Sequence, residues 1–166
     1  MRFVRKAKIP TWLPVVRDDR EKRPFDLPLD AFHVTTKRLV TGDYSFVGLR
    51  SIVAIERKSG LAEICSDLSG KNRPRFLRFL GRMSKYPVRI MLIEGNGPND
   101  IFDAVDYRGG TTPLHRTVAY WLSKISVEYR IPTLFVGDPA MPGLIEQVFR
   151  DAYAAGVVYR DRGDTR

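Results

Sequence analysis

From residue 61 onward, the chain alternates between helical apolar periodicity and short apolar segments, and this alternation constrains the fold most strongly. The periodicity predicts helices over residues 61–68, 75–85, 114–129 and 142–155. Two apolar runs, at residues 88–93 and 131–136, stand between these helices and are typical of buried strands, and a long loop is expected at residues 95–110. A sheet buried on both faces needs helices on both sides, so this half of the chain predicts a sheet flanked by helices.

The first 60 residues contain strand-like segments without helical periodicity. We expect strands at residues 13–17, 31–40, 44–49 and 51–55, whose spacing predicts an antiparallel meander. Joined to the second half, they predict the α/β class with a mixed central sheet. The 166 residues suit a single domain over residues 1–166, with its core at about residues 13–156 and a charged, frayed C-terminal tail.

The charge balance favours a polyanionic partner. Lys and Arg number 28 against 19 Asp and Glu, for a net charge of +9, and nucleic acid is the commonest polyanion for such a chain. The alternative is that the excess cations only keep the protein soluble. The single cysteine, Cys65, excludes an intramolecular disulfide, and no apolar run approaches the roughly 18 residues that span a membrane. We therefore expect a soluble, cytoplasmic protein without membrane contact.

A row of cations follows one face of the helix expected at residues 75–85. The row consists of Arg75, Arg78, Arg82 and Lys85, and the apolar residues Phe76, Phe79, Leu80 and Met83 fall on an adjacent face. This helix can therefore pack on one side and present four cations on another. Such cations hold DNA backbone phosphates without reading the base sequence. The alternative is a solvated helix face.

Acidic residues gather at the ends of the first strands, although the chain is basic. These acids are Asp18, Asp19, Glu21, Asp43 and Glu56. Along the fourth strand, alternation puts the side chains of Glu56 and Lys58 on one side and that of Arg57 on the other. The pattern therefore predicts that carboxylates and a lysine meet at one place.

This set of residues suits phosphodiester hydrolysis, which needs a hard cation to polarise a phosphoryl oxygen and activate a water. Magnesium takes oxygen ligands, usually one or two carboxylates plus waters and substrate phosphate, and Asp43 and Glu56 can supply them. Lys58 can orient the attacking water, help deprotonate it or neutralise developing charge. The alternative is that these are solvated strand-end charges in salt bridges. Because clustered carboxylates alone would repel DNA, their presence in a basic chain favours a metal site.

The longer pattern resembles the nuclease domain of the XPF family of structure-specific endonucleases. The sequence has Asp18-Asp19-Arg20-Glu21, then Gly42-Asp43-Tyr44, then Glu56-Arg57-Lys58. That family is identified by an Asp-x-Arg-Glu segment, Gly-Asp and Glu-Arg-Lys, in this order and at about this spacing. The specific motifs cover residues 15–59, and the later elements fit in order. The resemblance implies the restriction-endonuclease-like fold of the Asp…Glu-x-Lys nuclease superfamily.

The resemblance also implies roles for individual residues. It makes Asp43 and Glu56 metal ligands and Lys58 the catalytic lysine. Asp18 and Glu21 become supporting acids, for the metal or the water, and we include Asp18 in the expected metal set. By the same carry-over, Arg20 and Arg57 become phosphate-side or structural cations in the site.

Two departures from the family pattern stand out. The family usually has an Asp four residues after the lysine, where this chain has Ala62; Glu63 or Asp67 could substitute, and Glu63 is favoured. Family members also often continue into tandem helix-hairpin-helix repeats or are fused to a helicase. Neither follows here, so we expect a compact stand-alone version of the kind found in bacteria and phages.

We therefore expect a Mg²⁺-dependent DNA endonuclease in DNA repair or recombination, with Mn²⁺ able to substitute. The resemblance implies branched substrates such as flaps, forks and nicked junctions, and a homodimer. We place a dimer seam on the last two helices because their aromatic residues exceed what one small core needs; these are Tyr120, Trp121, Phe149 and Tyr153. The alternatives are a non-catalytic DNA-binding or recombination accessory protein, a junction resolvase, and an RNA-cleaving enzyme of the same superfamily.

Overall fold

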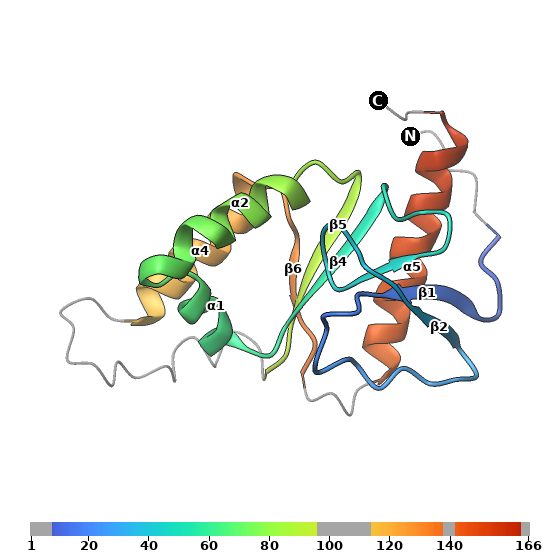
Figure 1. Cartoon of the computed structure of the whole chain (residues 1–166), viewed down its shortest axis with the longest axis horizontal. Coiled ribbons are helices and arrows are strands. Elements are labelled where there is room, and N and C mark those ends of the chain that lie inside the picture. The colour runs from blue at the N-terminus through green and yellow to red at the C-terminus, as the bar shows by residue number, and fades with distance from the viewer. Residues whose placement is uncertain (1–7, 96–113, 138–141, 164–166) are drawn as a thin grey trace.

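A six-stranded mixed sheet forms the centre of the molecule, in the order β2-β1-β3-β4-β5-β6 (Figure 1). The structure is a computed structural model that describes residues 8–95, 114–137 and 142–163, so the loop expected at residues 95–110 falls almost wholly outside them. The strands are β1 (Leu13–Arg17), β2 (Phe32–Thr36), β3 (Tyr44–Phe46), β4 (Val53–Lys58), β5 (Val88–Ile93) and β6 (Thr133–Phe135).

Helices cover both faces of this sheet, as the alternation in the sequence predicts. One side carries α1 (Leu61–Asp67), η1 (Gly70–Asn72), α2 (Arg73–Met83) and α4 (Leu114–Val127), and the other carries α5 (Pro142–Asp161) (Figure 1). Pro74 lies in the first turn of α2, where its missing N–H has no helical partner to lose. No helix of the described residues is long and apolar enough to cross a membrane.

Two apolar cores result, one on each side of the sheet. On the α5 side, Phe149 is fully buried and its ring meets those of Tyr44 and Phe46 edge-on. On the other side, Ile64 of α1 and Ile125 of α4 are fully buried against the sheet. Burying each such side chain stabilises the fold by about 1.5–3 kcal/mol. The predicted α/β class with a mixed central sheet is confirmed.

The predicted antiparallel meander is wrong at its first step, because β1 and β2 are parallel. Leu13 pairs with Phe32 and Arg17 with Thr36, whereas β1 pairs antiparallel with β3, and β3 with β4. A two-residue turn makes a hairpin, but residues 18–31 are long enough to return the chain to the start of β1. The backbone N–H of Leu13 then donates to the carbonyl of Ala31.

The last helix and strand also differ from the prediction. Helix α5 continues to Asp161, beyond the expected end at residue 155, because Val157 and Tyr159 carry its apolar stripe further along the core. Strand β6 was expected to be buried, but it lies at the sheet edge, and Leu134 is 40% exposed.

The dimer seam predicted on the last two helices is wrong. Phe149 of α5 is fully buried in the core on its side of the sheet, and Trp121 of α4, on the other side, is only 7% exposed. Tyr153 packs against the α5 core, and only Tyr120 of the four is largely exposed, at 58%. A domain with two cores uses more aromatic residues than the one core assumed from the sequence. The homodimer itself stays a prediction without an assigned surface.

Candidate active site

Asp43 is held at the mouth of the β3–β4 pair by backbone contacts on both sides. Its N–H donates to the carbonyl of Ile55 (2.8 Å), and its carbonyl accepts from the N–H of Asp18 (2.8 Å). The preceding Gly42 has φ 81°, and a Cβ there would lie 2.9 Å from the Ile55 carbonyl oxygen. Only glycine fits this approach of the chain to β4, so the Gly-Asp dipeptide fixes where the Asp43 side chain starts.

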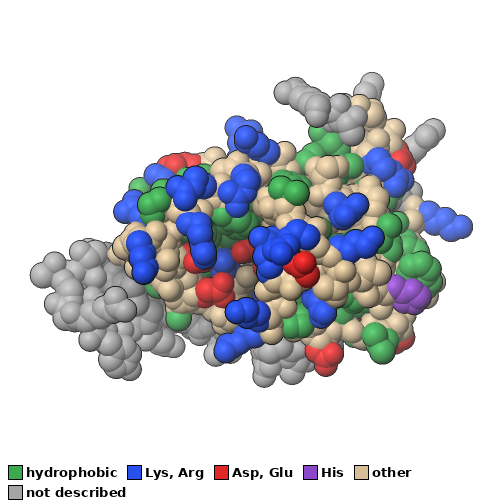
Figure 2. All heavy atoms as spheres, in the orientation of Figure 1, with side chains coloured by type: hydrophobic (Ala, Val, Ile, Leu, Met, Phe, Trp, Pro, Cys, Tyr) green, Lys and Arg blue, Asp and Glu red, His purple; other side chains and the backbone are tan. Residues whose placement is uncertain are grey.

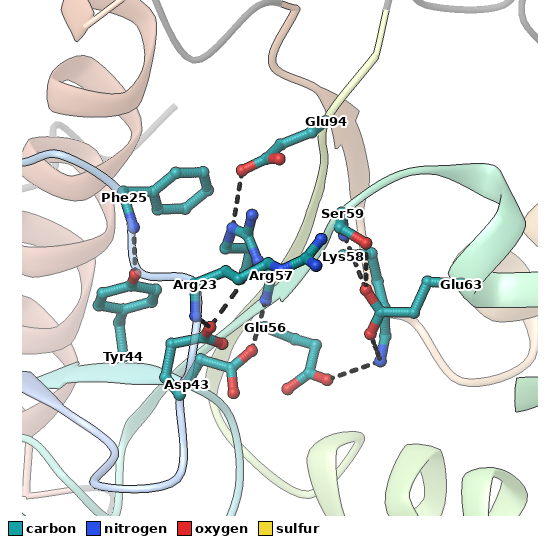
Figure 3. Close-up of polar contacts among 11 residues, drawn as sticks. Arg23, Phe25, Asp43, Tyr44, Glu56, Arg57, Lys58, Ser59, Glu63 and Glu94 are labelled. Carbon is teal, nitrogen blue, oxygen red and sulfur yellow. Dashed lines mark hydrogen bonds and ion pairs between the residues drawn. The ribbon is translucent and has the colours of Figure 1, made fainter.

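The carboxyl groups of Asp43 and Glu56 point into the same space between β3 and β4 (Figure 3). One oxygen of Asp43 accepts the backbone N–H of Arg57 at 2.8 Å. Burial raises the pKa of Asp43 to about 6, with a further contribution from the charge of Glu21. Burial raises the pKa of Glu56 to about 8, and the neighbouring Asp43 adds to the shift. The two groups therefore resist being ionised together.

Lys58 is buried beside this pair and is surrounded by carboxylates. Its Nζ lies 3.1 Å from Glu56, 3.1 Å from Glu63 and 2.9 Å from Asp67. Burial lowers the pKa of Lys58, but these carboxylates more than offset it, so the pKa lies above its ordinary value. Lys58 therefore remains an ammonium at neutral pH, which favours the predicted roles of orienting and neutralising over that of a base.

The family Asp is absent at Ala62, and both acids that could substitute for it lie on α1 near Lys58. Glu63 and Asp67 each contact Lys58, and Glu63 also accepts hydrogen bonds from the backbone N–H and the hydroxyl of Ser59, both at 2.8 Å. A helix that starts three residues after Lys58 can present two acids, four residues apart, toward one point. Both candidates for the family Asp thus contact Lys58, and the favoured substitution by Glu63 stays a prediction.

Both oxygens of the Asp18 carboxylate are occupied by hydrogen bonds within the protein. Its Oδ1 accepts from the backbone N–H and Nε of Arg20, and its Oδ2 accepts from Nη2 of Arg20 and the N–H of Leu39, at 2.6–3.0 Å. No oxygen is left for a metal ion, so Asp18 drops out of the expected metal set. We infer a structural role for Asp18 and Arg20, because the backbone of Asp18 is also hydrogen-bonded to that of Asp43.

Arg57 points to the opposite face of the sheet, as predicted, and acts there as a structural cation. Its side chain is only 9% exposed, donates to Glu94 at 2.7 Å, lies 3.8 Å from Glu21 and stacks over the ring of Phe25. Glu21 thus lies near Arg57, and its charge also contributes to the raised pKa of Asp43. The expected phosphate contact of Arg57 is not supported, because buried acids already neutralise the guanidinium.

Glu94 is a site residue that the sequence reasoning missed. It follows β5, which pairs in parallel with β4, so the carboxyl ends of the two strands meet at one edge (Figure 3). Its backbone N–H donates to the carbonyl of Lys58 at 2.9 Å. An acid directly after a buried strand beside the Glu-x-Lys strand would have been the signal.

The donors at this edge fit a magnesium ion held by two carboxylates. Among the described residues, no group of three or more His, Cys, Asp or Glu side chains is arranged to hold a metal ion. Magnesium commonly takes only one or two protein carboxylates and fills its other positions with water and phosphate. Asp43 and Glu56 meet that requirement, since a cation would offset the burial that raises both pKa values and the charge of Asp43 that adds to that of Glu56.

Three of the four predicted cations lie on α2, and the fourth, Lys85, follows its end by two residues. Arg75, Arg78, Arg82 and Lys85 are all exposed, and none of them makes an ion pair with the described residues. Phe76, Leu80 and Met83 are buried on the other side of the helix, and Phe79 is partly buried. Figure 2 shows Lys and Arg side chains around a few acidic ones near the centre of this face. The predicted division of the helix is confirmed.

The fold and this carboxylate–lysine cluster define the class: an α/β nuclease domain of the Asp…Glu-x-Lys type. The sequence matches the family model of the ERCC4 domain over residues 17–144. Because the match spans most of the chain, the chain belongs to the ERCC4 domain family. The resemblance to the XPF-type nuclease domain is confirmed.

Two solved structures share the fold. XPF from Aeropyrum pernix superposes with a TM-score of 0.60 and 23% sequence identity, covering 83% of this chain and 60% of that one. XPF from Aeropyrum pernix in complex with DNA gives 0.61 and 22%, covering 85% of this chain and 64% of that one. The chain thus spans less than two thirds of the length of these structures. A comparison with curated proteins found no match.

Proposed function

We propose that the protein is a magnesium-dependent endonuclease that hydrolyses phosphodiester bonds in DNA. The observation that carries the proposal is the convergence of Asp43, Glu56 and Lys58 at one edge of the sheet, beside the cations of α2. Membership of the ERCC4 domain family supports it. One of the similar structures is a complex with DNA, which supports DNA as the substrate.

Each residue of the cluster has a task in this reaction. Asp43 and Glu56 would hold Mg²⁺, which when bound polarises the phosphoryl oxygen and lowers the pKa of a coordinated water. The Lys58 ammonium, fixed by Glu63 and Asp67, lies where it can neutralise negative charge that develops on the phosphate. The cations of α2 hold the backbone, and the family resemblance favours branched DNA over plain duplex.

A cleavage assay tests the proposal with labelled duplex, single-stranded, flap, fork and four-way-junction DNA, in Mg²⁺ or in EDTA. Wild type, Asp43→Asn and Asp19→Asn are compared, because Asp19 is an exposed acid of the same region outside the cluster. We expect Mg²⁺-dependent cutting by wild type and Asp19→Asn and none by Asp43→Asn. Cutting by Asp43→Asn at the wild-type rate would show that the site is wrong. No cutting of any substrate, with binding retained, would indicate an accessory protein.

A further inference from the structure

Three arginines gather at the end of the sheet opposite to the carboxylates. Strands β4, β5 and β6 are parallel, so their amino ends lie at the same end of the sheet. Arg50 precedes β4 by three residues, Arg89 is the second residue of β5, and Arg130 precedes β6 by three residues. The sheet therefore has acids at the carboxyl ends of its parallel strands and cations at the amino ends.

Two adjoining hollows meet at Tyr86, near this end of the sheet, and the first also reaches Arg38 and Leu39, which follow the carboxyl end of β2. The first, of about 430 Å³, is lined by Arg38, Arg50 and Tyr86, with the chain at Leu39 and Ser51. The second, of about 590 Å³, is lined by Lys85, Arg89 and Arg130 and again by Tyr86. Tyr86 separates the two hollows. No Asp or Glu of the described residues lines either of them.

Most of these cations lack a neutralising partner. Arg50, Lys85 and Arg130 are exposed and form no ion pair within the described part of the chain. Arg38 pairs only with the exposed Asp19, at 3.1 Å. Five cations facing two hollows without acids repel one another, and an anion would relieve that repulsion.

Arg89 is fixed in place by backbone carbonyl groups. Its Nε donates to the carbonyl of Arg130 at 2.7 Å, and its Nη1 donates to that of Tyr86 at 2.6 Å. Arg130 has φ 54°, a left-handed conformation uncommon for residues other than glycine, and such conformations cluster at functional sites. The second hollow therefore contains an oriented guanidinium beside the exposed side chains of Lys85 and Arg130.

We propose that the two hollows bind backbone phosphates of a nucleic-acid strand, as a second contact site lined by neither Asp43 nor Glu56. The proposal rests on the proposed function, since the bound nucleic-acid strand would be the one that is cleaved at Asp43 and Glu56. Lys85, two residues beyond the end of α2, extends the cation row of that helix into the second hollow, so the two sets of cations are continuous. At about 3.3 Å per residue, the six residues of β4 separate the two ends of the sheet by roughly five or six nucleotides along a strand.

The test uses Arg50→Glu/Arg130→Glu, because neither arginine belongs to α2 or touches the carboxylates. Its matched control is Lys8→Glu/Arg160→Glu, which changes the net charge equally at exposed positions that line neither hollow. Binding of a fluorescein-labelled forked DNA is measured by anisotropy in EDTA over a range of salt concentrations. We expect about tenfold weaker binding than the control and a salt slope shallower by about two units, near 0.9 per lost phosphate contact.

Affinity and salt slope equal to those of the control would overturn the inference, whether or not the protein cleaves DNA. A rise in melting temperature with inorganic phosphate, lost in the variant while DNA affinity is unchanged, would also overturn it, because the hollows would then serve free phosphate. DNA shortened to fewer than about five nucleotides beyond the cut should abolish the difference between variant and control. If circular dichroism shows the double variant to be unfolded, the single variant Arg50→Glu is tested in its place. Its salt slope should be shallower than that of the control by about one unit.

Discussion

The Asp43 carboxylate lies beside the Glu56 carboxyl group, and after burial it is the largest cause of the raised pKa of Glu56. Glu56 has a pKa of about 8 and Asp43 one of about 6, both above their ordinary values. A protein that binds a polyanion gains nothing from crowding its own acids. The crowding is explained if a divalent cation occupies the space between them.

The metal-free protein should lose stability as the pH rises from about 4 to 8. Acids with raised folded-state pKa values bind more protons in the folded state than in the unfolded one, so the free energy of unfolding falls with pH in this window. For Asp43 and Glu56 together the loss is on the order of a few kcal/mol, or several degrees in melting temperature. Thermal melts in EDTA from pH 5 to pH 8 measure it.

Asp43→Asn is the informative variant for this pH dependence. The amide oxygen can still accept the N–H of Arg57, while the negative charge beside Glu56 is removed. We expect a melting temperature at pH 8 above that of wild type, and a smaller fall between pH 5 and pH 8. A lower melting temperature for Asp43→Asn at pH 8 would mean that the two carboxyl groups do not repel each other.

Magnesium should stabilise the protein most where the two acids are ionised. At a metal concentration ten times the dissociation constant, binding adds about 1.4 kcal/mol, which corresponds to about 3–5 °C for a chain of this size. Melts at pH 8 with Mg²⁺ or Mn²⁺ measure the shift. Asp43→Asn should abolish it and Asp19→Asn should preserve it. An equal shift in Asp43→Asn would place the ion elsewhere.

The site could be predicted from the sequence where backbone rules determine it. Gly42 before Asp43 marks a tight approach of the chain, and the alternation of Glu56, Arg57 and Lys58 sorts these side chains onto two faces. Both are local features, and the structure bears them out. The apolar face of α2 and its exposed cations follow from helical periodicity in the same way.

The parts that could not be predicted depend on contacts between distant segments. Asp18 and Asp43 look alike in sequence, but the N–H of Leu39, 21 residues away, takes one oxygen of Asp18. Glu94 becomes a site residue only because β5 pairs in parallel with β4. The parallel pairing of β1 with β2 likewise depends on the path of residues 18–31. No pattern within one element carries this information.

The acids that surround Lys58 should control the rate of cleavage. Asp67→Asn removes the negative charge 2.9 Å from Nζ of Lys58, and we expect kcat to fall about tenfold with KM unchanged, because the ammonium is held less firmly in position. Glu63→Gln should cost more, since Glu63 also binds Ser59. Single-turnover cleavage rates measure both variants, with Glu128→Gln, directly after α4, as the control. Wild-type kcat in Asp67→Asn/Glu63→Gln would show that Glu63 and Asp67 do not position Lys58 for the reaction.

The cations of α2 should dominate the salt dependence of DNA binding. Arg78→Glu/Arg82→Glu should weaken binding and flatten the slope of log K against log salt by about two units. Anisotropy in EDTA measures this, with Lys8→Glu/Arg160→Glu as the charge-matched control. A slope equal to that of the control would show that α2 lies outside the interface.

Gly42→Ala and Gly48→Ala separate the need for space from the need for an unusual backbone conformation. Both glycines have positive φ, 81° and 78°, so alanine at either costs about 1–2 kcal/mol. At Gly42 the new Cβ would also lie 2.9 Å from the Ile55 carbonyl oxygen, whereas at Gly48 nothing lies within 4 Å. We therefore expect Gly42→Ala to lose about 3 kcal/mol or more in urea melts, and Gly48→Ala about half as much. Because the displaced segment carries Asp43, Gly42→Ala should also lose Mg²⁺-induced stabilisation. Equal losses in the two variants would mean that β4 yields to the extra methyl group and does not fix Asp43.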